Sequence, residues 1–145
     1  MHKVAPQVEA ALSVPLLHIA DATALKLKQD GIKKVGLLGT AYTMEMALYK
    51  DRLIRDHGID VIIPNADDRQ LIHDIICKEL VRGIIRPESR EIYCRITEDL
   101  AQQGAQAVIL GCTEIGLLLT PEFTRVALYD TARIHALAAV DWSLA

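Results

Sequence analysis

Short apolar runs alternate along the chain with longer stretches in which apolar positions recur every three or four residues. Short runs rich in β-branched residues are typical of buried strands, and the wider spacing is typical of helices with one apolar face. A glycine precedes three of the short runs, as expected where a helix ends and a strand follows. The pattern predicts parallel strands near Leu16, Val35, Val61, Val108 and Val126.

Each predicted helix begins at a residue that favours a helix start. Asn65, followed three positions later by Asp68, resembles a capping box. The helices are expected from Asp21 or Thr23 to Gly31, from Thr40 or Thr43 to about His57, from Asn65 to about Arg82, from Pro87 to Gly104, and from Asp130 to Leu144. Strands that alternate with helices predict an α/β fold, a parallel sheet with flanking helices joined by right-handed crossovers.

Composition agrees with this fold class. The 145 residues suffice for one domain, and the chain is 51% hydrophobic but only 4% aromatic, which suits aliphatic helices on a parallel sheet. The net charge is -3 and the basic residues are dispersed. A nucleic acid or an anionic membrane surface is therefore not expected as a partner, because either would need a clustered positive face.

Several common sites are not expected. Three cysteines cannot all pair within one chain, and their spacing forms no CxxC or zinc motif, so they are interpreted as reduced thiols of a cytoplasmic protein. The five histidines show no spacing typical of a metal site. The segment 36–40 lacks the third glycine and the Lys-Ser/Thr pair of a phosphate loop, and the apolar segment 14–20 is too short to span a bilayer. No metal or cofactor is therefore expected.

The candidate chemistry follows the apolar run 105–110, where Gly111 is followed by a thiol, a hydroxyl and a carboxylate. In a parallel sheet, ligands gather beyond the carboxyl ends of the strands. A helix start after Cys112 would lower the pKa of the thiol, and Thr113 with nearby N–H groups could hold a carboxylate while Glu114 orients substrate or accepts protons. From the residues alone, a buried cysteine that only packs in the core is an equally good interpretation.

The other candidates have simpler explanations. Thr40 and Thr43 are expected mainly as helix caps, although they follow another strand and should share the edge of the sheet with Cys112. Cys77 and Cys94 fall within predicted helices and are expected to pack on helix faces.

Three segments together resemble the C-terminal part of the aspartate/glutamate racemases: 107–115 with its Gly-Cys-Thr-Glu motif, 37–44 and 129–132. The resemblance covers essentially the whole chain. It implies a cofactor-independent enzyme with two α/β domains, each of which contributes one cysteine to opposite sides of the substrate's α-carbon. Cys112 matches the second of these cysteines, and the resemblance implies that Thr113, Glu114, Thr40 and Thr43 contact the substrate.

The chain departs from the family at its start. The first cysteine of the family lies in a C-x-N-T-x-H segment, and Met1-His2-Lys3 resembles the tail of that segment without the cysteine. We therefore expect residues 1–20 to be a remnant of the N-terminal domain, residues 21–124 to form a complete domain, and residues 125–145 to return to the missing one. The missing thiol would come from a second copy or from a complementing N-terminal fragment.

The resemblance favours racemisation of a small acidic amino acid, aspartate or glutamate, by proton transfer at the α-carbon. Lys78, Arg82 and Arg86 are candidates to bind the side-chain carboxylate, although a solvated helix face explains them equally well. Two alternatives remain open. One is a non-catalytic binding or assembly module that keeps the fold, and the other is a related hydrolase or lyase in which the same thiol is a nucleophile.

Overall fold

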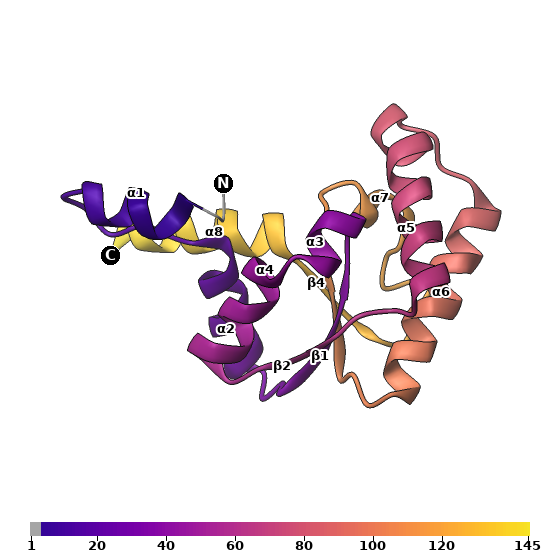
Figure 1. Ribbon diagram of the computed structural model, residues 1–145, viewed down its shortest axis with the longest axis horizontal. Helices are drawn as coiled ribbons and strands as arrows, with labels where there is room; N and C mark the ends of the chain where they lie inside the picture. The colour runs from indigo at the N-terminus through magenta and orange to yellow at the C-terminus, as the bar shows by residue number, and fades with distance from the viewer. Residues whose placement is uncertain (1–3) are drawn as a thin grey trace.

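The computed structural model describes residues 4–145, without the side chains of residues 6, 47 and 48. Within this part of the chain a parallel sheet has the strand order β2-β1-β3-β4 (Figure 1). Its strands are β1 (Lys34–Leu38), β2 (Asp60–Ile62), β3 (Ala107–Leu110) and β4 (Ala127–Asp130). The predicted α/β class is confirmed, and β1 and β3 form the centre of the sheet.

Helices connect the strands and cover both faces of the sheet. They are α1 (Ala5–Ala11), α2 (Ile19–Gln29), α3 (Ala41–Glu45), α4 (Ala47–Asp51), the π-helical η2 (Arg52–Asp56), α5 (Ala66–Lys78), the 3-10 helix η3 (Leu80–Arg82), α6 (Pro87–Gln102), α7 (Ile115–Leu118) and α8 (Thr131–Leu144). The Asn65 side chain accepts a hydrogen bond from the Asp68 N–H, as the sequence predicts. Across residues 4–145 none of these helices has the length and apolarity needed to cross a membrane.

Two apolar cores lie on opposite faces of the sheet, because successive side chains of a strand point to opposite sides. Leu37 and Ile109 belong to the core beneath α2, η2 and α8, while Leu38 and Leu110 belong to the core beneath α5, α6 and α7. Gly36 allows α6 to approach closely, since an added Cβ there would lie 2.8 Å from the Leu100 side chain.

The segment that leads into α2 differs from the prediction in two respects. The strand expected near Leu16 is wrong, because residues 12–18 form no strand and α2 begins at Ile19. Pro15 has no N–H to donate to a neighbouring strand. The helix cap also differs from the expected Asp21 or Thr23, since Nδ1 of His18 accepts a hydrogen bond from the Ala20 N–H at 3.1 Å.

The single helix expected from Thr40 to about His57 is interrupted at Met46, whose backbone is extended. The interruption lets the segment pass from one face of the sheet to the other. Before it, Met44 is buried in the core beneath α5 and α6, and after it, Tyr49 and Leu53 are buried in the core beneath α2. A continuous amphipathic helix would place its apolar stripe on only one of these faces.

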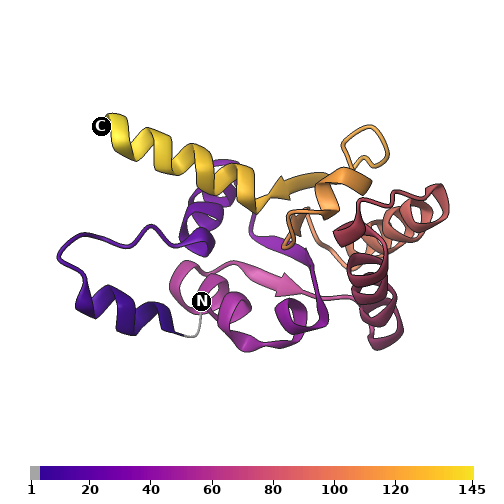
Figure 2. The same ribbon diagram turned by 90° about the horizontal axis from the view of Figure 1, so that it is seen from above.

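Helices α1 and α8 both lie at the end of the molecule opposite α5 and α6 (Figures 1 and 2), but they are well apart from one another in Figure 2. We call these two separate helices the terminal arm. Leu137 and Val140 are exposed on α8, whereas Leu16, Leu17 and Ile134 are half-buried. Further exposed apolar side chains of the arm and its linker are Val4, Val8, Leu12, Val14, Trp142 and Leu144. The expected match of Met1-His2-Lys3 to a cysteine segment lies outside the described residues, and the proposed division at residues 20 and 124 stays a prediction.

The exposed apolar surface of the terminal arm should make the protein self-associate or bind a hydrophobic dye. The double substitution Leu137→Asp and Val140→Asp should reduce both, measured by light scattering and dye fluorescence. Leu71→Asp, at an exposed apolar position on α5, is the matched control and should change neither. A wild-type monomer that binds no dye would contradict this expectation.

Candidate active site

The ends of β1 and β3 bring the predicted site residues together. Leu38 pairs with Leu110 in the parallel register, and the Gly111 N–H donates to the Leu38 carbonyl at 2.7 Å. The turns that follow carry Thr40 and Cys112, so both lie at the same edge of the sheet, as the sequence predicts. The amide N–H of Thr40 donates to the Cys112 sulfur.

Close backbone packing fixes the two threonines. Thr40 is the N-cap of α3, and its hydroxyl accepts from the Thr43 N–H at 3.3 Å and lies 3.2 Å from the Thr43 hydroxyl. The Thr43 side chain lies against both glycines of the edge. A Cβ at Gly39 would be 3.0 Å from Thr43, and one at Gly111 would be 3.2 Å from Thr43 and only 2.8 Å from the Leu38 carbonyl oxygen.

The predicted lowering of the Cys112 pKa is wrong. Burial raises the pKa of this thiol, the N–H of Thr40 acts in the opposite direction, and the negative charges of Glu114 and Cys77 raise it further. The helix expected to stabilise the thiolate begins only at Ile115 and has four residues, so its positive end is weak and removed from the sulfur. Cys112 is therefore mainly a thiol at neutral pH.

The remaining predicted residues surround this thiol to different extents. Thr113 is exposed, and Glu114 is half-buried and close enough to act on the Cys112 pKa. Lys78 forms an exposed ion pair with Asp74 at 2.9 Å, which fits the solvated-face interpretation. Arg82 lies in η3, which contacts α7 immediately after the cysteine turn, whereas the exposed Arg86 is the N-cap of α6.

The sequence analysis did not identify His73 and Cys77 of α5 as neighbours of the predicted site residues. This helix contacts α3, where the Ala41 N–H donates to Nδ1 of His73 at 3.4 Å. The Cys77 sulfur lies 3.8 Å from both ring nitrogens of His73, and its charge acts on the pKa of Cys112. Cys77 is exposed, so the prediction that it only packs on a helix face is wrong. The four-residue spacing of His73 and Cys77 was the available signal.

Cys94 has the structural role predicted for it. Its side chain packs against the core beneath α6, donates to the Phe123 carbonyl, and has its pKa raised by burial.

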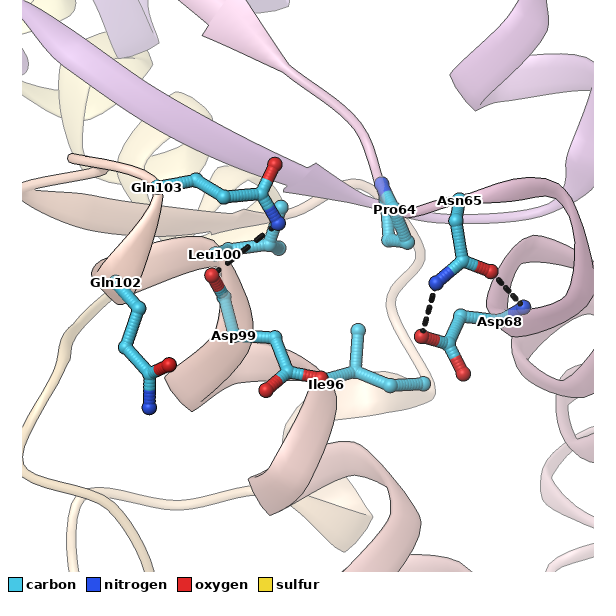
Figure 3. Close-up of a pocket in the computed structure, with 8 residues that line it drawn as sticks. All are labelled: Pro64, Asn65, Asp68, Ile96, Asp99, Leu100, Gln102 and Gln103. Atoms are coloured by element: carbon cyan, nitrogen blue, oxygen red, sulfur yellow. Dashed lines mark hydrogen bonds between the residues drawn. The ribbon is translucent and has the colours of Figure 1, made fainter.

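A separate polar hollow of about 260 Å³ lies between the start of α5 and the second half of α6 (Figure 3). Asp68 lines it, and the Arg95 guanidinium holds the pKa of this carboxyl below its usual value. Asn65 also bonds to Asp68, so this carboxylate is already satisfied by the protein. The hollow does not include Cys112. Among residues 4–145, no three histidine, cysteine or acidic side chains are grouped to hold a metal ion.

The family of Asp/Glu/hydantoin racemases matches residues 1–139. The chain belongs to this family. A Yersinia pestis protein provisionally identified as an Asp/Glu racemase superposes with a TM-score of 0.96 and 52% identity, over 100% of this chain and 63% of the other. An aspartate racemase homologue from Pyrococcus horikoshii OT3 gives a TM-score of 0.92 and 32% identity over 99% of this chain and 63% of the other.

A curated member of the family is also similar in sequence. The broad specificity amino-acid racemase RacX of Bacillus subtilis (strain 168) is 24% identical over 99% of this chain and 61% of its own length. The chain thus spans between 61% and 63% of the length of these three racemase relatives.

Gly111→Ala should destabilise the fold by about 1 to 3 kcal/mol, because the added methyl group would overlap the Leu38 carbonyl. Gly116→Ala is the matched control, since its Cβ would meet only the Asp130 carboxylate at 3.5 Å. Urea unfolding should show a lower midpoint for the first variant alone. Equal midpoints would show that the edge can relax around a side chain at position 111.

Iodoacetamide should label Cys77 before Cys94 and Cys112 at neutral pH, because Cys77 is exposed while burial raises the pKa of the other two thiols. Time-resolved mass spectrometry of tryptic peptides measures the order. The Cys112 rate should continue to rise with pH above about 8.5, the ordinary thiol value. If Cys112 reacts first, groups in addition to the Thr40 amide must stabilise its thiolate.

Proposed function

We propose that this chain provides one side of a cofactor-independent racemase site for a small acidic amino acid, aspartate or glutamate. One observation supports this most directly. In a chain of the racemase family, Cys112 lies at the joined ends of β1 and β3, with its sulfur on the Thr40 amide. A thiol at this edge of a parallel sheet can reach a ligand bound beyond the strands.

The proposed reaction moves one proton at the α-carbon. A Cys112 thiolate takes the α-proton, the C–H electron pair remains on the substrate as a carbanion, and an acid on the opposite face returns a proton. In the reverse direction Cys112 is the donor. The raised pKa of its thiol suits the donor role and makes the thiolate a stronger base, but it also lowers the fraction of thiolate present at neutral pH.

The surrounding residues include hydroxyl groups, a carboxylate and basic side chains that can bind the charged groups of an amino acid. The hydroxyls of Thr40, Thr43 and Thr113 can donate to the α-carboxylate. Glu114 would repel a carboxylate, so we assign it to the substrate's ammonium group. Arg82, on the 3-10 helix that contacts α7, is the best placed of the three basic candidates for the side-chain carboxylate, ahead of Lys78 and Arg86.

We propose that the acid on the opposite face comes from outside the described residues, either from the family's first cysteine or from a second copy of this chain. The exposed apolar side chains of the terminal arm are a suitable surface for the part that carries it. This proposal retains the division into residues 1–20, 21–124 and 125–145, and a cytoplasmic location in which the thiols stay reduced.

A non-catalytic binding or assembly module is the second candidate. The observation that favours it is the raised pKa of Cys112, since little thiolate is present at neutral pH to begin the reaction. Amino-acid binding without exchange of the α-hydrogen would support this function. The hydrolase or lyase alternative would instead give a covalent adduct on Cys112, visible by mass spectrometry.

The purified chain should racemise neither aspartate nor glutamate at a useful rate, because proton return requires a second acid within about 3 Å of the other face. In D₂O it should at most exchange the α-hydrogen of one enantiomer, followed by proton NMR and chiral chromatography. Cys112→Ala should lower this exchange at least about a hundredfold, as expected for loss of a general base. Cys94→Ala is the matched control and should leave the exchange unchanged.

Rapid racemisation by these 145 residues alone would contradict the proposal that the second acid lies outside them. A second acid or base within residues 1–145, such as Glu114, would then have to return the proton.

A further inference from the structure

The start of α3 is a point at which two other elements converge. Its consecutive amide groups, those of Thr40 and Ala41, donate to side chains from different parts of the fold. The first donates to the Cys112 sulfur after β3, and the second donates to Nδ1 of His73 on α5. His73 and Cys112 are therefore held on adjacent peptide units, although 39 positions separate them in the sequence.

This arrangement fixes the protonation of the neutral imidazole. Nδ1 of His73 accepts the Ala41 N–H and so carries no hydrogen, which leaves the ring proton on Nε2. The Cys77 sulfur lies 3.8 Å from Nε2 and also 3.8 Å from Nδ1, so it is beside the ring and not in line with the Nε2–H bond. The Nε2–H group can therefore donate to a strong acceptor such as a carboxylate.

Cys77 lies beside this point of convergence. Its sulfur is 3.8 Å from the ring of His73, which accepts the Ala41 N–H, and the side chain is exposed to solvent. The same proximity makes the charge of Cys77 raise the pKa of Cys112. Helix α5 also extends past the ends of the strands in Figure 1, and η3, which follows it, contacts α7 just after the turn that carries Cys112.

We propose that His73 and Cys77 line the substrate-binding surface opposite Cys112, with His73 Nε2–H donating to a carboxylate of the bound amino acid. This inference rests on the proposed racemase-type function of Cys112 and adds a contact that the sequence resemblance does not include. His73 is thereby a substrate-binding residue, and Cys77 is a neighbouring thiol that the bound substrate covers.

Protection from alkylation tests the proposal without any need for turnover. The rates of iodoacetamide labelling at Cys77, Cys94 and Cys112 are measured with increasing D- or L-aspartate and D- or L-glutamate. At least one of these amino acids should slow labelling of Cys77 and Cys112 with the same half-protecting concentration. Cys94, which lies on α6 against Phe123, should be unaffected.

Substitution of His73 then tests the contact itself. His73→Ala should raise the half-protecting concentration about tenfold or more, as expected for loss of a hydrogen bond to a charged group. His73→Gln, which retains an N–H donor near the Nε2 position, should raise it less. Gln70→Ala, an exposed position one turn earlier on α5, is the matched control and should not change it.

The outcomes separate this inference from the proposed function. Protection of Cys112 without protection of Cys77, or an unchanged half-protecting concentration in both His73 variants, would overturn the inference and leave the proposed function standing. Absence of protection at Cys112 by all four amino acids would contradict the proposed function as well. If His73→Ala does not fold, the wild-type protection pattern and the His73→Gln variant still test the inference.

Discussion

The close approach of the ends of β1 and β3 is the constraint on which the candidate site depends. The Gly111 N–H reaches the Leu38 carbonyl at 2.7 Å, and neither Gly39 nor Gly111 has room for a side chain. The space left by these two glycines is occupied by Thr43, which sets the first turn of α3. Because that turn is fixed, the Thr40 amide is available to Cys112 and the Ala41 amide to His73. Larger side chains in place of the two glycines would move the start of α3 away from Cys112 and His73.

The electrostatics of the site oppose ionisation of Cys112. Burial and two neighbouring negative groups raise the pKa of the thiol, and one backbone N–H acts against them. The nearby Tyr93 hydroxyl is affected in the same direction, by burial first and then by Cys112, Cys77 and Glu79. Such a site keeps the thiol protonated at neutral pH.

The helices around the sheet extend from it at two ends. Helix α5 extends beyond the strands at one end, and α1 and α8 lie at the other (Figures 1 and 2). The side chains of Leu137 and Val140 on α8 are exposed. The interruption at Met46 lets one short segment contribute to both cores. Met44 packs in the core beneath α5 and α6, and Tyr49 packs in the core beneath α2 on the opposite face of the sheet.

The sequence by itself determined the features that depend on neighbouring residues. The caps at Asn65 and Asp130, the buried strands 35–38 and 107–110, and the position of Cys112 after a strand all follow from local patterns. Tertiary structure alone decided the interruption at Met46, the unpaired segment around Leu16, the raised pKa of Cys112 and the approach of His73 and Cys77. Each of these depends on groups distant in the sequence, because burial and charge act through space and a local pattern does not record them.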